Sequence, residues 1–117
     1  MSGTKNYLRL IVLHCNKIFS RIKDVTFNDW HNDILLQDAV CFRLLALSEC
    51  VKKYQKENPI LQTEHPEIPW NDIIRLYDKI LHHYHDVDSN EIWGIIISGI
   101  IPLYNVIHCN QDFLSTE

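Results

Sequence analysis

Apolar residues return every three or four positions over four long stretches of the chain, which is the spacing that places them on one side of an α-helix. The stretches cover residues 4–23, 33–57, 69–86 and 90 to about 113. In the first stretch the apolar stripe consists of Tyr7, Ile11, Cys15, Ile18 and Ile22. The pattern therefore predicts four main helices, each with one face directed toward a common core.

The segments between these helices carry capping and helix-breaking residues. Thr26, followed three residues later by Asp29, resembles the N-terminal capping arrangement of a short helix. Prolines at positions 59, 66 and 69 lack an amide proton and restrict the residues before them, so we expect residues 58–70 to run as an extended loop. Pro69 is a suitable residue to begin the next helix.

The most apolar run of the chain, residues 92–107, lies in the last predicted helix. It is shorter than the roughly 20 residues that a membrane span needs, and it contains two Gly and a Pro. We therefore interpret it as a buried helix or a subunit interface rather than a membrane segment. Asp88 or Ser89 is expected to cap this helix, and Pro102 is expected to kink it.

The composition agrees with a helical domain. The chain has 117 residues with three Gly and four Pro, and we expect one all-α domain covering residues 1–117. Its net charge of −4 excludes a broad basic surface, so any contact with nucleic acid must be local or made in an oligomer. The four cysteines lie far apart with no C-x-x-C pair and no signal peptide ahead of them, which indicates reduced thiols in a cytoplasmic protein.

The stretch YDKILHHYHDVD, residues 77–88, concentrates three His, two Tyr and three Asp. At about 100° per residue, Arg75 and His82 fall within about 20° of each other, and Asp78 lies in the turn between them. An imidazole that exchanges protons near neutral pH and a guanidinium that holds a phosphate are what metal-independent cleavage of RNA requires. These residues are therefore candidates for a phosphodiester-cleaving site.

The same residues also fit other interpretations. The histidines are equally typical of a solvated helix face. His82 with His85 or Asp86 has the spacing of a zinc site, although no Cys lies nearby to complete a structural set. Tyr84 falls on the predicted core stripe with Tyr77, so its ring is expected to pack while its hydroxyl stays at the edge, within reach of a modifying enzyme.

Four segments of the sequence together resemble the HepT-like branch of the HEPN domain superfamily. They are QDAV (37–40), HPEIPW (65–70), LHHYHDVDSNEIW (81–93) and the following IIPL, and the likeness extends over residues 7–107. The resemblance implies a four- to five-helix up-and-down bundle of HEPN type that forms a homodimer. It also implies a ribonuclease toxin of a type VII toxin–antitoxin system, neutralised when a minimal nucleotidyltransferase antitoxin transfers AMP to a tyrosine.

Carried over residue by residue, the resemblance makes His82 the catalytic histidine and Tyr84 the AMP acceptor. Tyr77 stands where HepT-like proteins most often have the arginine of the motif, so Arg75 is the substitute within the looser superfamily spacing. A second departure lies at Phe42 and Leu45, where relatives often carry Arg and Glu. Arg43 lies one place along from the first of these positions.

The sequence thus supports two hypotheses. In the first, the protein is a cytoplasmic, metal-independent endoribonuclease without a cofactor, in which His82 acts as general acid or base, Arg75 steadies the phosphate and Asp78 orients one of them. Its partners are RNA, the nucleotidyltransferase and a second copy, without a membrane. In the alternative, the protein is a catalytically degenerate HEPN subunit that binds a nucleotidyltransferase or a nucleotide and does not cleave RNA.

Overall fold

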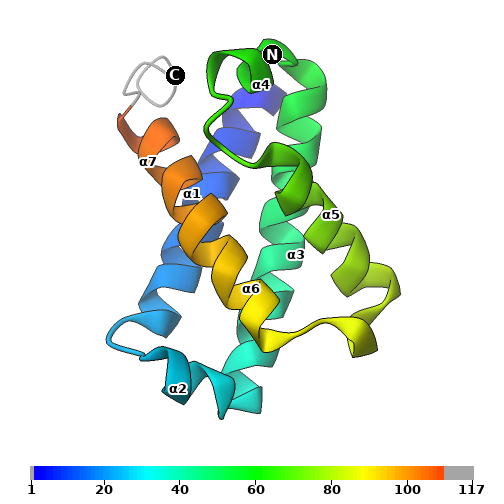
Figure 1. Cartoon of the computed structure of the whole chain (residues 1–117). Coiled ribbons are helices and arrows are strands. Elements are labelled where there is room, and N and C mark those ends of the chain that lie inside the picture. Colours follow the sequence, from blue (N-terminus) through cyan, green and yellow to red (C-terminus); the bar gives the residue numbers. More distant parts are fainter. Residues whose placement is uncertain (1, 110–117) are drawn as a thin grey trace.

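Four long helical segments alternate in direction along the molecule (Figure 1). The computed structural model describes residues 2–109, with side chains described for residues 7–108. The helices are α1 (Ser2–Ile22), α2 (Phe27–His31), α3 (Ile34–Glu57), α4 (Ile60–Glu64), α5 (Trp70–His82), α6 (Ser89–Ile95) and α7 (Ile101–Cys109). A 3₁₀ turn (Tyr84–Asp86) follows α5, and a π turn (Ile96–Ile100) joins α6 to α7. The all-α, up-and-down bundle is confirmed, and the described residues contain no strand.

Side-chain caps fix where the helices begin. Thr26 and Asp29 form a capping box at α2, in which the Asp29 amide donates to Thr26 Oγ1 (3.1 Å) and the Thr26 amide donates to Asp29 Oδ2 (3.4 Å). Asp33 accepts from the Leu36 amide at the start of α3 (3.0 Å). Asp88 accepts from the amide of residue 90 at the start of α6 (2.8 Å), so the capping residue of the last helix is Asp88.

The core lies where α3 meets α1 on one side and α5 on the other, while α7 packs on α1. Trp30 of α2 is fully buried at one end of this core, and its indole Nε1 donates to the Ser89 carbonyl (2.9 Å). The thiols of Cys15, Cys41 and Cys50 are free and buried, and the Cys109 side chain lies outside the described residues. Burial keeps these three thiols protonated, because it raises the pKa of each of them.

The prediction of an extended loop over residues 58–70 was wrong in part, because the segment contains the one-turn helix α4. Pro59 stands at the N-terminus of α4 with φ −64° and ψ −20°, the conformation that its ring favours and that suits the first turn of a helix. Leu61 on this turn is buried in the core. The apolar contact therefore folds a segment that three prolines would otherwise leave extended.

The helix predicted over residues 69–86 ends earlier, at His82. His83 leaves the helical conformation (φ −139°, ψ 47°), and the chain continues as the 3₁₀ turn Tyr84–Asp86. Tyr84 consequently does not lie on the core stripe of α5, and it is 45% exposed. On α5 itself Leu76 is buried where Tyr77 was expected, and Tyr77 is half-buried.

The last predicted helix is interrupted by the π turn Ile96–Ile100, which immediately precedes α7 and Pro102. Proline has no amide proton and its ring crowds the preceding turn, so the expected disturbance takes the form of this wider turn. The predicted end near residue 113 lies outside the described residues. By length and composition alone, Ser89–His108 could cross a membrane. Its apolar side packs in the core through Ile92, Ile96, Ile100, Leu103 and Ile107, and 33% of the most apolar window of this span is buried.

The close approach of the π turn to α5 predicts a difference between two glycines. A Cβ on Gly99 would lie 3.1 Å from Ile95 Cδ1 and 3.3 Å from Pro69 Cγ, whereas a Cβ on Gly94 would meet nothing within 4 Å. We expect Gly99→Leu to lower the free energy of unfolding by about 1–3 kcal/mol through overpacking. Gly94→Leu should change it little or raise it by up to about 1 kcal/mol through helix propensity. Urea unfolding measures both, and equal effects would contradict the packing described here.

Candidate functional site

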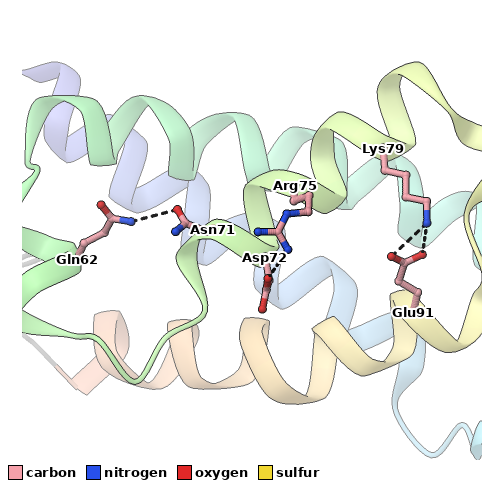
Figure 2. A network of polar contacts seen from close by, with 6 residues as sticks. All are labelled: Gln62, Asn71, Asp72, Arg75, Lys79 and Glu91. Carbon is pink, nitrogen blue, oxygen red and sulfur yellow. Dashed lines mark hydrogen bonds and ion pairs between the residues drawn. The ribbon is translucent and has the colours of Figure 1, made fainter.

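The three residues predicted to cleave RNA all lie on the outer side of α5. Arg75, Asp78 and His82 are exposed, and His82 is the last residue of the helix. Arg75 Nη1 donates to Asp72 Oδ1 at 3.0 Å, so its guanidinium is paired with a carboxylate one turn earlier (Figure 2). Within the described residues, the side chains of Asp78 and His82 make no hydrogen bond. The structure therefore places the three on one face of α5 without joining them.

Arg75 also lines a groove of about 320 Å³ between α5 and the α6 segment. Leu76 and Ile95 form its apolar part. Lys79 lies in the same groove and binds Glu91, with Nζ 3.0 Å from Oε1 and 3.4 Å from Oε2 (Figure 2). Each cation of the groove thus faces a carboxylate, and the groove is close to neutral.

The Arg75–Asp72 pair is an exposed one, since 74% of the Arg75 side chain and 56% of the Asp72 side chain are accessible to solvent. Ion pairs of this kind are worth about 0.2–1 kcal/mol. The guanidinium can therefore exchange Asp72 for a phosphate at small cost. A phosphate offers two oxygens to the two parallel N–H groups of an arginine, which is the stronger contact.

Tyr84 has a partner that the sequence did not indicate. Its hydroxyl donates to Asp38 Oδ1 of α3 at 2.6 Å, across 46 residues of sequence. This hydrogen bond, followed by partial burial, raises the pKa of Tyr84 to about 12. The Cys41 thiol lies beside the pair, and burial together with the charge of Asp38 raises the pKa of Cys41 to about 11. The phenol of Tyr84 therefore keeps its proton at neutral pH.

Asp38 belongs to the QDAV segment, which contributed to the family resemblance but was not proposed as a site. A signal was present, because Asp38 is the one acidic residue of the chain between Asp33 and Glu49. Its neighbours on the outer side of α3, Leu35 and Phe42, are exposed apolar residues (82% and 68%). A carboxylate among exposed apolar side chains is a sign of a surface with a function.

A hollow of about 370 Å³ opens beside the Tyr84 hydroxyl. Its lining consists of Asp38, Cys41, Phe42, Leu45, Ile80 and Tyr84. Two of these, Phe42 and Leu45, are the positions where relatives were expected to carry Arg and Glu. In this chain both positions are apolar, and they form an apolar wall beside Tyr84.

Arg43 is not among the residues that line this wall. One residue further along a helix is about 100° further around it, and Arg43 accordingly points toward α1. There its Nη1 lies 3.3 Å from His14 Nδ1. Burial and the neighbouring guanidinium of Arg43 lower the pKa of His14, which keeps this imidazole neutral at neutral pH. The His14–Arg43 contact was not foreseen from the sequence.

The structure changes the zinc interpretation as well. His82 ends α5, whereas His85 and Asp86 belong to the separate 3₁₀ turn. The i,i+3 and i,i+4 geometry that this interpretation assumed is therefore lost at His83. Among the residues that the structure describes, no three His, Cys, Asp or Glu side chains gather as metal ligands.

Comparison with known proteins adds a family and several relatives. The family model for ribonuclease HepT-like proteins matches residues 11–109. "Probable ribonuclease HepT" of Thermococcus cleftensis is 33% identical over 99 residues, covering 85% of this chain and 87% of the relative. "Putative RNase TTE0752" of Caldanaerobacter subterraneus subsp. tengcongensis is 31% identical over 103 residues, covering 88% and 89%. No solved structure matches the chain.

The hydrogen bond between Tyr84 and Asp38 predicts an unusual titration. We expect Asp38→Ala to lower the pKa of Tyr84 from about 12 toward the ordinary value near 10, because the acceptor of the phenolic proton is removed. In the wild type the bond stabilises the fold below about pH 10 and is lost as the pH rises through about 12. Carbon NMR of labelled tyrosine, with Tyr84→Phe for assignment, measures the pKa. An unchanged pKa in the alanine variant would contradict the assigned cause.

Proposed function

The chain belongs to the ribonuclease HepT-like family, and we propose that it is a metal-independent endoribonuclease, the toxin of a type VII toxin–antitoxin pair. Family membership supports a ribonuclease, and the residues on α5 support the mechanism. The observation that carries the proposal is the exposed imidazole of His82 on the same face of α5 as the guanidinium of Arg75. RNA supplies both the nucleophile, its 2′-hydroxyl, and the phosphate that it attacks.

In the proposed mechanism His82 exchanges the proton, either as the base for the 2′-hydroxyl or as the acid for the leaving oxygen. Arg75 leaves Asp72 and holds the scissile phosphate, whose negative charge increases in the transition state. Asp78 lies four residues before His82 and three residues after Arg75, so it is a neighbour of both on the helix surface. Its proposed role is to orient His82 or Arg75 when RNA is bound.

A homodimer is part of this proposal. His82 and Arg75 are exposed on one helix rather than enclosed, and a second copy would provide the opposite wall of a cleft. Two copies of the α5 stripe would also concentrate cationic groups in a chain whose net charge is −4. The exposed apolar residues Phe42 and Leu35 near Tyr84 suit a protein contact of this kind.

Neutralisation is proposed to act at Tyr84. In this proposal a minimal nucleotidyltransferase antitoxin transfers AMP to the hydroxyl of Tyr84, a residue that is 45% exposed. The added nucleotide places bulk and a negative charge two residues from His82, where they would block and repel RNA. A cytoplasmic location is part of the same proposal.

A second function is favoured by one specific observation. Tyr77, at the position of the family arginine, is half-buried, and Lys52 Nζ lies over its ring at 5.5 Å from the centroid. A packed aromatic side chain thus stands where the family motif is expected to have its arginine. The substitute, Arg75, is bound to Asp72. The alternative is a degenerate HEPN subunit that binds a nucleotidyltransferase or a nucleotide and does not cleave RNA.

RNA cleavage in EDTA separates these two functions. The purified wild type is incubated with transfer RNA and messenger RNA, and the end groups of the products are identified. We expect His82→Ala and Arg75→Ala to reduce the rate by about 10²–10⁴-fold, since each removes a group that acts on the reacting atoms. His83→Ala, which removes an exposed neighbouring imidazole, is the matched control and should cut at the wild-type rate. A wild type that cuts nothing, or a His82→Ala variant that cuts normally, would favour the binding subunit.

The Arg75–Asp72 pair gives a second, quantitative expectation. Asp72→Asn should raise kcat/KM for RNA by about 1.4- to 5-fold, which corresponds to the 0.2–1 kcal/mol of an exposed pair that no longer competes with the phosphate. Glu49→Gln is the matched control, because it removes the same charge from a carboxylate that pairs with Lys53 on α3. An equal gain in both variants would mean that only the net charge matters.

A further inference from the structure

The contact between Tyr84 and Asp38 goes beyond a structural hydrogen bond. A separation of 2.6 Å between a hydroxyl oxygen and a carboxylate oxygen is typical of charge-assisted O–H···O⁻ bonds, which are shorter than ordinary O–H···O bonds. The two residues come from separate elements, the 3₁₀ turn after α5 and the outer side of α3. The fold thus brings a base into contact with the one atom that the proposed modification must use.

A tyrosine that accepts a nucleotide has to lose its phenolic proton. Tyr84 does not lose it spontaneously, because its pKa is raised to about 12 by the hydrogen bond to Asp38 and by partial burial. A base must therefore remove the proton as the new bond forms, and it must lie within hydrogen-bond reach of the hydroxyl. Among the residues described, Asp38 is the one whose side chain accepts from the Tyr84 hydroxyl at that range.

We propose that Asp38 is the general base for the modification of Tyr84, an inference that rests on the proposed transfer of AMP to this residue. Tyr84 Oη attacks the α-phosphorus of the nucleoside triphosphate held by the antitoxin, and Asp38 takes the phenolic proton. A new bond forms between Oη and the α-phosphorus. The bond between that phosphorus and the bridging oxygen breaks, and pyrophosphate leaves. Asp38 then releases the proton to solvent.

The surroundings of the pair suit this role. The hollow beside it contains no Lys or Arg among its lining residues, so no cation there occupies the carboxylate of Asp38. Two ionisable groups lie beside the pair. They are Cys41, whose thiol stays protonated because its pKa is raised to about 11, and His85, whose ring centroid lies 6.5 Å from that of Tyr84. Phe42, Leu45 and Ile80 complete an apolar wall.

The experiment measures single-turnover transfer of AMP from ATP to the full chain by its cognate nucleotidyltransferase, followed by intact mass and peptide mapping. The variants are Asp38→Asn, which keeps an acceptor oxygen but cannot take the proton, and Asp38→Glu, which keeps a carboxylate. Asp86→Asn is the matched control, since it removes an exposed carboxylate two residues from Tyr84. Tyr84→Phe verifies the site.

We expect Asp38→Asn to slow transfer by about 10²-fold or more while the KM for ATP stays unchanged. Its rate should keep rising with pH toward ionisation of the phenol, whereas the wild type reaches a plateau at lower pH once its base is deprotonated. Asp38→Glu should recover part of the rate, and Asp86→Asn should match the wild type. Partial recovery with Glu distinguishes a base from a residue that only holds the turn in place.

Three results would overturn the proposal, and they are distinguishable. If the wild type accepts no AMP at Tyr84, both the proposed modification and the proposed role of Asp38 are wrong. If Asp38→Asn is modified at the wild-type rate, only the proposed role of Asp38 is wrong. If Asp38→Asn and Asp38→Glu are slowed equally and keep the pH profile of the wild type, Asp38 positions Tyr84 and is not its base.

Discussion

The burial of one side of α3 between α1 and α5 is the constraint on which the rest of the structure depends. Val40, Leu44, Leu47 and Val51 fill this side and are almost completely buried. Truncating a side chain of this kind to Ala typically costs about 2–5 kcal/mol, a large part of the stability of a small domain. The rotation of α3 about its axis is therefore fixed, and the opposite side must face outward. Asp38 and Phe42 are exposed for this reason.

The end of α5 is the second determinant of the site. Had α5 continued to residue 86, Tyr84 would have packed along the core stripe with Ile80 and Ile73. The break at His83 instead turns Tyr84 away from that stripe, and its hydroxyl meets Asp38 on α3. His82 is the last residue of α5 and immediately precedes the break. The two candidate side chains, His82 and Tyr84, are thus separated by one residue in the chain.

Much of the fold could be predicted from local patterns in the sequence. The period of the apolar residues predicted the four helical segments, and Thr26 with Asp29 predicted a cap. Each of these signals depends on residues that are only a few positions apart in the sequence. The Arg75–Asp72 pair could have been predicted in the same way, since residues three apart on a helix are neighbours. Asp38 and Tyr84 were not, because their contact spans 46 residues and depends on how α3 and the 3₁₀ turn are packed. The resemblance to the family identified His82 and Tyr84 as residues but could not indicate what they contact.

Two of the groups in the proposed mechanisms, those of Arg75 and Tyr84, are engaged by a carboxylate in this structure. Arg75 is held by Asp72, and the Tyr84 hydroxyl is held by Asp38. The two pairs differ in what a phosphate does to them. At Arg75 an incoming phosphate competes with Asp72 for the same cation, so the carboxylate weakens binding without taking part in the reaction. At Tyr84 the proposed role of the carboxylate is to accept a proton from the atom that attacks the phosphate, so the same type of side chain would assist the transfer. A chain with a net negative charge can therefore carry out phosphate chemistry at a site where the carboxylate accepts a proton from the attacking atom. A carboxylate that competes with the phosphate for a cation gives no such assistance.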